Sequence, residues 1–297
     1  LVVLYYFDAE TYLIDKSVRD IEPATAVILS LLGLGVAWVL YDIACRILRI
    51  EALMAVFLLG LVAASAYGAS EVFSGRAAYL QVGAMLGTIM AGNVLFNIIP
   101  AHWDLIRAKE AGEAPDPGPA LEAKRRSVHN NYLTLGVVFA MISNHFPFTY
   151  GHDQGWLVLV ALIVVGAWVR HYFNLRHAGR TVWWIPVTAA IGVVALAIAI
   201  KPDDVSGGGA PAEAVNAEQA RAIVQERCVP CHSQTPTQDG FDTAPAGVRL
   251  DTLEEIRAQA DQIKAQAVDS KAMPLGNVTG MTDEERDKLG AWIASLK

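Results

Sequence analysis

Ala52–Gly68 reads ALMAVFLLGLVAASAYG and contains no charged side chain. Five other apolar stretches of similar length follow the same pattern: Ala24–Tyr41, Ala78–Ile99, Tyr132–Phe148, Trp156–Phe173 and Val182–Ile200. About 20 residues of helix cross a ~30 Å hydrocarbon layer, and a helix satisfies its backbone polar groups internally. One such stretch is compatible with a buried helix of a soluble protein. Six in succession predict an all-α, polytopic transmembrane helix bundle.

The composition divides the chain into two parts. Of its 297 residues, 18% are charged, against about 25% in soluble proteins, and the mean hydropathy is +0.35. The net charge of −7 lies entirely in residues 203–297. We therefore expect a membrane domain at 1–201, a flexible Gly- and Pro-rich linker at 202–216 and a soluble domain at 217–297. The opening LVVLYYF resembles the end of a further spanning helix, so we expect an upstream piece.

The connecting segments predict how the bundle is oriented. Lys and Arg are concentrated in alternate segments, at 42–51, 100–131 and 170–181. The intervening segments hold few basic residues or are dominated by acidic ones: 8–23, 69–77 and 149–155. The positive-inside rule places the first set in the cytoplasm and the C-terminal domain outside. We interpret 100–131 as a cytoplasmic loop with a flexible part at 114–120.

Cys228-Val-Pro-Cys231-His232 is a C-x-x-C-H motif, the attachment signature of c-type haem. Two thiols at this spacing reach the two vinyl groups on one edge of the macrocycle. The adjacent His232 then lies under the iron as an axial ligand. A helix that begins with Asn216 as N-cap, with Gln219 completing a capping box, is expected to lead into the motif.

The second iron ligand is expected downstream. Met273 lies in the sequence KAMPL, and its rival Met281 directly precedes the capping box Thr282–Glu285 of the last helix. We predict Met273 as the ligand, and a small all-α mono-haem cytochrome c domain. His/Met ligation raises the reduction potential and favours electron acceptance. The apolar face expected for the last helix consists of Leu289, Trp292, Ile293 and Leu296.

Two other readings of the motif are weaker. A thioredoxin-like dithiol requires a βαβ pattern around the cysteines, which is not visible. A zinc site requires further Cys or His ligands, and residues 233–297 contain neither. The third cysteine, Cys45, is interpreted as inert.

Polar residues within or beside the apolar stretches are candidate functional positions, because such groups are costly in lipid. On the predicted cytoplasmic side they are Asn93, Asn97, His102, His129 and Asn131. On the outer side they are Asn144 and His145, which also fit an ordinary helix end before Pro147. His171 and His177 are interpreted as interfacial. His145 is suited to general-base chemistry near neutral pH, with Asn144 as a hydrogen-bonding group.

Three segments resemble one family closely: Asn97–Trp103 (NIIPAHW), His129–Leu135 (HNNYLTL) and Met141–Pro147 (MISNHFP). The chain resembles the bacterial membrane-bound urate oxidases (urate hydroxylases) with a C-terminal cytochrome c domain. The resemblance covers nearly all residues, including Cys228, Cys231, His232 and Met273. Members of this family carry further membrane helices upstream.

The resemblance implies oxidation of urate to 5-hydroxyisourate in the inner membrane, with the cytochrome domain in the periplasm. Electrons would pass to one covalent haem c, then to a soluble cytochrome c or terminal oxidase, without hydrogen peroxide. Urate and the lipid bilayer are the expected partners, and nucleic acid is not. Because urate loses two electrons and one haem accepts one, either the haem turns over twice or the membrane part holds a second redox cofactor.

Two alternatives remain at this stage. One is a quinol or other substrate:cytochrome c oxidoreductase. The other is a non-catalytic membrane domain fused to an electron-transfer cytochrome.

Overall fold

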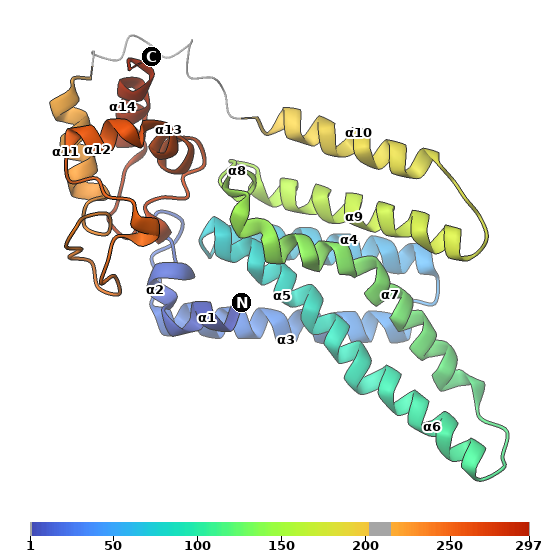
Figure 1. The fold of residues 1–297 in the computed structure, drawn as a ribbon. Helices are drawn as coiled ribbons and strands as arrows, with labels where there is room; N and C mark the ends of the chain where they lie inside the picture. Colours follow the sequence, from blue (N-terminus) through green and yellow to red (C-terminus); the bar gives the residue numbers. More distant parts are fainter. Residues whose placement is uncertain (1, 202–214, 297) are drawn as a thin grey trace.

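The computed structural model describes residues 2–201 and 215–296, and all regular secondary structure in these ranges is helical. The linker expected at 202–216 falls mostly outside the described residues. Figure 1 shows a bundle of long helices and a separate group of short helices at one end of it. This agrees with the fold class expected from the sequence, a membrane helix bundle followed by a small all-α domain.

Six long helical runs form the bundle. They are α3 (Pro23–Ile47), α4 (Glu51–Ser70), α5 (Gly75–Asn93) continued through the π-helical turn η1 (Val94–Ile98) into α6 (Ile99–Glu110), α7 (Pro117–Ile142), α9 (Gly155–His177) and α10 (Trp184–Ala199). Within the described residues, four of these are long and apolar enough to cross a membrane: Pro23–Ile47, Glu51–Ser70, Gly75–Glu110 and Gly155–His177. The other two predicted spans are also helical, but α10 has only 16 residues and α7 begins with a charged half. Six crossings therefore remain a prediction.

The segment 100–131 is not the loop expected from its Pro and charge content. Helices α6 and α7 continue through most of it and project from the bundle as a helical hairpin (Figure 1). Pro117 occupies the first turn of α7, where its missing N–H is not needed, and the Asp116 carboxylate accepts from Gly118 N. The prolines therefore begin a helix here instead of preventing one.

Helices α5 and α7 approach each other closely at Gly83. A Cβ built on Gly83 would lie 2.4 Å from the Ala140 Cβ, whereas one on Gly87 would meet nothing within 4 Å. A methyl group at Gly83 would push the helices apart. Of the small-residue pair Gly83 and Gly87, only the first serves helix packing in this chain.

The C-terminal domain is built from α11 (Ala217–Arg227), α12 (Leu253–Ala258), α13 (Ala260–Ile263) with the π-helical turn η4 (Lys264–Asp269), the 3-10 turns η3 (Pro245–Gly247) and η5 (Leu275–Asn277), and α14 (Asp283–Ala294). The capping boxes expected at Asn216–Gln219 and Thr282–Glu285 are both present. Leu289, Trp292 and Ile293 are buried, but Leu296 is exposed, because α14 ends at Ala294.

One end of the bundle carries all the segments that the charge pattern placed outside. Helices α1 (Val2–Phe7) and α2 (Ala9–Tyr12), the 71–74 connection, and η2 (Ser143–His145) with α8 (Pro147–Tyr150) lie at the end that faces the C-terminal domain (Figure 1). Ser74 N donates to Leu13 O, which ties two of these segments together. We call this the near end, and the end with the α6–α7 hairpin the far end.

Candidate functional site

The C-x-x-C-H motif forms a tight turn directly after α11. His232 N and Cys231 N both donate to Cys228 O, at 2.9 and 3.2 Å. His232 Nδ1 lies 3.0 Å from Val248 O. A carbonyl can only accept, so Nδ1 carries the proton and the Nε2 lone pair is available for a metal. This second-sphere contact fits an axial haem ligand.

The surroundings of the two thiols do not favour the thiolate form that a redox dithiol needs. Neither Cys228 nor Cys231 is in a disulfide. Burial raises the pKa of the Cys228 thiol to about 12, although the Arg286 charge acts in the opposite direction. Burial also raises the pKa of Cys231. A reactive dithiol requires a lowered thiol pKa, and the described residues contain no cluster of three or more metal-binding side chains. The donor set therefore fits haem better than either alternative.

The two candidate methionines lie in different surroundings. Met281 is buried in the domain core, and its backbone is held by Asn277 through Met281 N to Oδ1 (2.9 Å) and Nδ2 to Met281 O (3.1 Å). Met273 is only half-buried, in the segment before η5, where Arg286 donates to its carbonyl at 2.7 Å. Met273 thus packs against the edge of the core, with part of its side chain exposed and its backbone fixed in place.

That segment also contacts the membrane domain. A Cβ on Gly151 would lie within 2 Å of Ser270 O, and one on Gly276 would lie 2.6 Å from Thr11 O and 2.9 Å from Ile14 O. Ala272 packs against the apolar core of the bundle. The residues on either side of Met273 are therefore seated on α2 and on the α8 turn.

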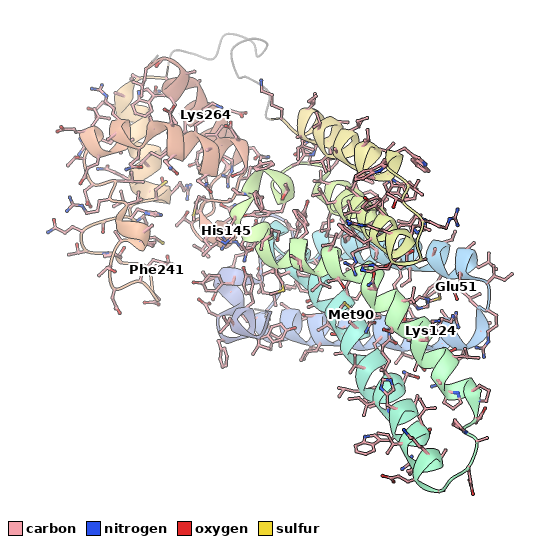
Figure 2. All side chains as sticks on the ribbon, turned by 45° about the vertical axis from the view of Figure 1, so that its right-hand side comes forward. Glu51, Met90, Lys124, His145, Phe241 and Lys264 are labelled. Carbon is pink, nitrogen blue, oxygen red and sulfur yellow. The ribbon has the colours of Figure 1, made fainter. Side chains whose placement is uncertain are left out.

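At the near end, Asn144 and His145 differ in environment. His145 is exposed, and Figure 2 shows it where the bundle faces the C-terminal domain. Asn144 is half-buried, and its Oδ1 is buried without a hydrogen-bond partner. The Tyr5 hydroxyl interacts with both Asn144 and Arg76. The structure thus brings two residues that the sequence did not single out, Tyr5 and Arg76, next to Asn144.

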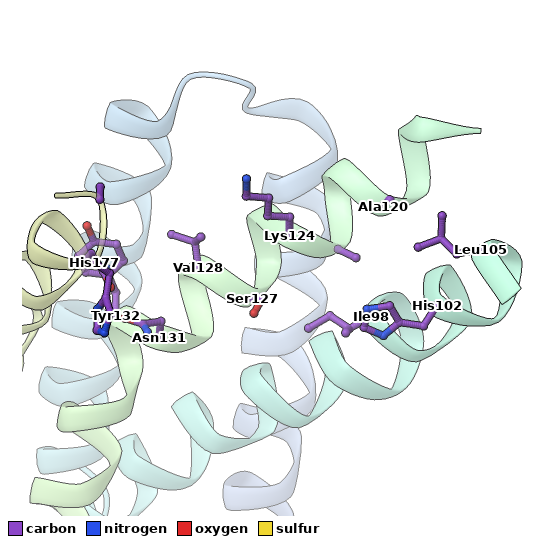
Figure 3. A pocket seen from close by; sticks show the side chains of 13 residues that line it. Ile98, His102, Leu105, Ala120, Lys124, Ser127, Val128, Asn131, Tyr132 and His177 are labelled. Atoms are coloured by element: carbon purple, nitrogen blue, oxygen red, sulfur yellow. The ribbon is translucent and has the colours of Figure 1, made fainter. Parts of the chain in front are cut away.

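The far-end candidates do not come together. His129 and Asn131, two residues apart on α7, face different sides of that helix. Asn131 and His102 line a cavity of about 730 Å³ between α6, α7 and α9 (Figure 3). Its other polar lining residues are Lys124, Ser127, Asn174 and His177. Arg170 Nε donates to Asn131 Oδ1 at 3.0 Å, and this hydrogen bond fixes the orientation of the Asn131 amide.

His129 belongs instead to a buried polar network centred on Arg126. Arg126 is 1% exposed and pairs with Asp42 (2.8 Å) and Glu122 (3.1 Å), and it donates to Asn93 Oδ1. Asn93 Nδ2 donates to the Tyr41 hydroxyl, which lies 2.8 Å from His129 Nδ1. The network links α3, α5 and α7.

Sequence reasoning found His129 and Asn93 but missed Arg126 and Tyr41. The available signal was spacing, because Glu122, Arg126 and Asn130 follow one another at intervals of four on a single helix face. Asn97 is not part of the network. Asn97 lies within the π-helical turn η1, which begins directly after Asn93 and shifts the helix phase, so residues four apart no longer share a face.

The histidine pair His129 and His171 is not free to bind a second haem axially. His129 and His171 line the same apolar groove between α4, α7 and α9. However, His129 uses Nδ1 for Tyr41 and Nε2 for Glu51, 3.2 Å away. His171 Nδ1 is held by the Tyr132 hydroxyl. This pair therefore gives no support to a second redox cofactor in the membrane part, which stays a prediction.

Fold and motif together define a membrane-embedded protein with a C-terminal c-type cytochrome domain. Comparison with protein families shows to which family each part of the chain is similar. The model of the urate oxidase N-terminal domain matches residues 1–201, and the cytochrome c model matches residues 217–297. The chain therefore belongs to the urate oxidase N-terminal family, as its resemblance indicated. No curated protein and no solved structure matches it.

The combination of domains is that of an oxidoreductase. A urate oxidase domain indicates urate as the substrate. A cytochrome c domain indicates haem c and electron transfer. The apolar helices indicate a lipid bilayer as the environment.

Proposed function

We propose that the protein oxidises urate to 5-hydroxyisourate at the near end of the bundle and transfers the electrons to its own haem c, without forming hydrogen peroxide. The haem domain would lie in the periplasm of a bacterium. Electrons would continue to a soluble cytochrome c or a terminal oxidase. The conversion takes up one water and releases two electrons and two protons, so it requires an electron acceptor and a group that removes a proton.

The observation that carries this proposal is the contact between the two domains. The segment Ser270–Gly276, which contains Met273, is seated on α2 and on the α8 turn. The predicted iron ligand thus lies in the part of the C-terminal domain that touches the membrane domain. Electrons released by chemistry at the near end would therefore need no diffusing carrier to reach the haem domain.

The haem fits the residues that would hold it. Cys228 and Cys231 would bind it covalently, and His232 Nε2 and Met273 Sδ would be its iron ligands; bound there, it supplies a one-electron acceptor of raised potential. Electron uptake one at a time requires that the partly oxidised substrate stay in place between two transfers. A site enclosed between the two domains meets this requirement because it excludes bulk water.

Two groups at the near end suit the chemistry on urate. Asn144 offers a buried amide oxygen without a partner, which can accept from a purine N–H. His145 is exposed at the same turn, where its imidazole can act as the general base. The far-end residue His129 lies sixteen positions from His145 along the chain, or about 24 Å of helix. Chemistry there would need a relay to reach the C-terminal domain.

The test is urate-dependent reduction of the haem in anaerobic membranes, followed by its absorbance. Urate is expected to reduce it, and quinol is not. His145→Ala is expected to abolish reduction by urate while reduction by dithionite persists. An active His145→Ala protein together with an inactive His102→Ala or His129→Ala protein would contradict the near-end site. Reduction by quinol alone would replace urate oxidation with quinol oxidation.

A further inference from the structure

A small cavity lies at the junction of the two domains, and neither domain forms it alone. The membrane domain contributes Tyr12, Asp15, Arg76 and Tyr150, and the C-terminal domain contributes Lys271 and Ala272. Its volume is about 60 Å³. A cavity needs roughly 15 Å³ of this volume to hold one water molecule, so this one has room for about four.

The cavity contains a positive charge without an acidic partner among the described residues. Arg76 is half-buried, and no acidic side chain among the described residues lies within ion-pair distance of it. Lys271, also on the rim, is paired with Asp283 at 3.0 Å. Asp15 accepts from Ser17 through both its backbone N–H and its hydroxyl. Arg76 is therefore the group in this cavity that is available to an anion, and its planar guanidinium suits a flat, multiply hydrogen-bonding ligand.

The remaining walls suit a planar ring. Tyr12 and Tyr150 both line the cavity, and no hydrogen bond from either hydroxyl to another described residue is present. Tyr12 is held by a ring contact with Tyr5 (5.5 Å between centroids) and Tyr150 by one with Tyr79 (5.9 Å). The Tyr5 hydroxyl interacts with Arg76 and also with Asn144, whose Oδ1 has no hydrogen-bond partner.

We propose that this interdomain cavity is the urate-binding site: Arg76 binds the purine anion, Tyr12 and Tyr150 flank its ring, and the Ser270–Gly276 segment closes the site. This inference rests on the proposed function and places its substrate. Urate is planar, negatively charged at neutral pH and bordered by N–H and C=O groups, which matches the walls. Because Lys271 and Ala272 immediately precede Met273, the bound purine lies beside the segment of the predicted iron ligand. The site is complete only when the domains are docked.

Binding can be measured without turnover. Full-length protein is reduced with dithionite, so that it has no electron acceptor, and its affinity for radiolabelled urate is determined by equilibrium dialysis. Arg76→Gln is expected to weaken binding at least tenfold, and Arg76→Lys is expected to weaken it less. Arg19→Gln, on the exposed segment after α2, is the matched control and is expected to bind urate normally.

A second pair of variants tests whether docking completes the site. Gly276 has a φ of +58°, and a side chain there would strike Thr11 O and Ile14 O; Gly240 has a φ of +87° and open space around it. Both substitutions by Val strain the backbone, but only Gly276→Val should separate the domains. We expect it alone to weaken urate binding, with the haem absorption spectrum preserved in both variants.

The outcomes separate this inference from the proposed function. Normal urate affinity in both Arg76→Gln and Gly276→Val would overturn the site, even if urate reduces the haem of the unmodified protein. Loss of binding in Lys124→Gln instead would move the purine to the far-end cavity of Figure 3. If the unmodified protein binds urate through Arg76 but urate does not reduce its haem, the site stands and the proposed function fails.

Discussion

Arg126 is a fully buried charge in the bundle whose neutralisation depends on two acidic residues from two helices. Asp42 reaches it from α3 and Glu122 from its own helix α7. The same Asp42 also pairs with Arg46, whose side chain is 71% exposed. Arg126 and Arg46 therefore share the partner Asp42 but differ in burial, so substituting each in turn isolates the effect of burial on stability.

Replacing Arg126 with Met should destabilise the membrane domain by about 3–5 kcal/mol, because it breaks a buried ionic network and leaves two partly buried carboxylates without their counter-charge. Arg46→Met should change stability by less than about 1 kcal/mol, as is typical of exposed pairs. Unfolding in detergent, followed by circular dichroism, measures both. Equal effects of the two substitutions would show that the Arg126 network contributes little to the fold.

The haem-binding residues make a separate prediction at this scale. A pyridine haemochrome assay should find one c-type haem per chain that resists acid-acetone extraction. Cys228→Ala or Cys231→Ala should weaken covalent retention, and the double substitution should abolish it. Met273→Ala should change the ligation spectrum and lower the potential. Met281→Ala should leave the spectrum unchanged and destabilise the core in which Met281 is buried. The reverse pattern would make Met281 the ligand.

At the scale of the element, α14 depends on its first turn. Thr282 Oγ1 accepts from Glu285 N, and Glu285 Oε2 accepts from Thr282 N. The Glu285 carboxylate also binds Arg227 at the end of α11 (3.0 Å). Burial raises the pKa of Glu285, but the hydrogen bonds from Arg227 and Thr282 outweigh it and hold the pKa below its usual value. One carboxylate thus caps a helix and joins the two terminal helices of the domain.

This arrangement predicts a stability loss at acid pH. A depressed pKa stabilises the folded domain above the unfolded-state value of about 4.3, and the contribution disappears as pH falls through the folded pKa. Glu285→Gln should therefore lower the free energy of unfolding by about 1–2 kcal/mol at pH 7 and by much less below about pH 4. Denaturant titrations of the full chain, followed by haem absorbance, test this. Glu284→Gln, which removes an exposed pair with Lys288, should have little effect at either pH.

For the whole molecule, docking and tethering act together. The linker predicted from the sequence at 202–216 would have a typical reach of roughly 20 Å and would hold the C-terminal domain at an effective concentration of order mM. The contacts of Gly151 and Gly276 then fix one orientation. The tether ensures that the domain remains nearby, and the contact surface determines which face it presents.

Cleavage of the linker at an inserted protease site within residues 202–216 should therefore slow urate-driven haem reduction at low protein concentration. Excess free C-terminal domain should restore the rate, because the docking surface is unchanged. Stopped-flow absorbance at several dilutions measures this. A rate that does not depend on dilution after cleavage would show that the docking contact alone holds the domains together.

The sequence by itself determined the features that depend on local pattern. Apolar runs such as Ala52–Gly68 must become helices in lipid, and the capping boxes at Asn216 and Thr282 need only residues three positions apart. Cys228, Cys231 and His232 are adjacent in the chain, so their joint role in haem binding could also be predicted. Even the near end of the bundle was predictable, because charge in each connecting segment is a local property.

Only the tertiary structure decided which distant side chains meet. The predicted cytoplasmic side grouped His129 with His102, but positions two apart on α7 face different sides, so Asn131 lines the far cavity while His129 joins Arg126 and Tyr41. The π-helical turn η1 rotates Asn97 away from the helix face of Asn93, and the four-residue spacing of an α-helix does not predict this rotation. Arg76 looked like a single loop charge, and it became a candidate ligand for urate only because folding placed it under the segment of Met273, almost two hundred residues away. Contacts of this kind depend on how helices pack against one another, and sequence patterns record only what happens within each helix.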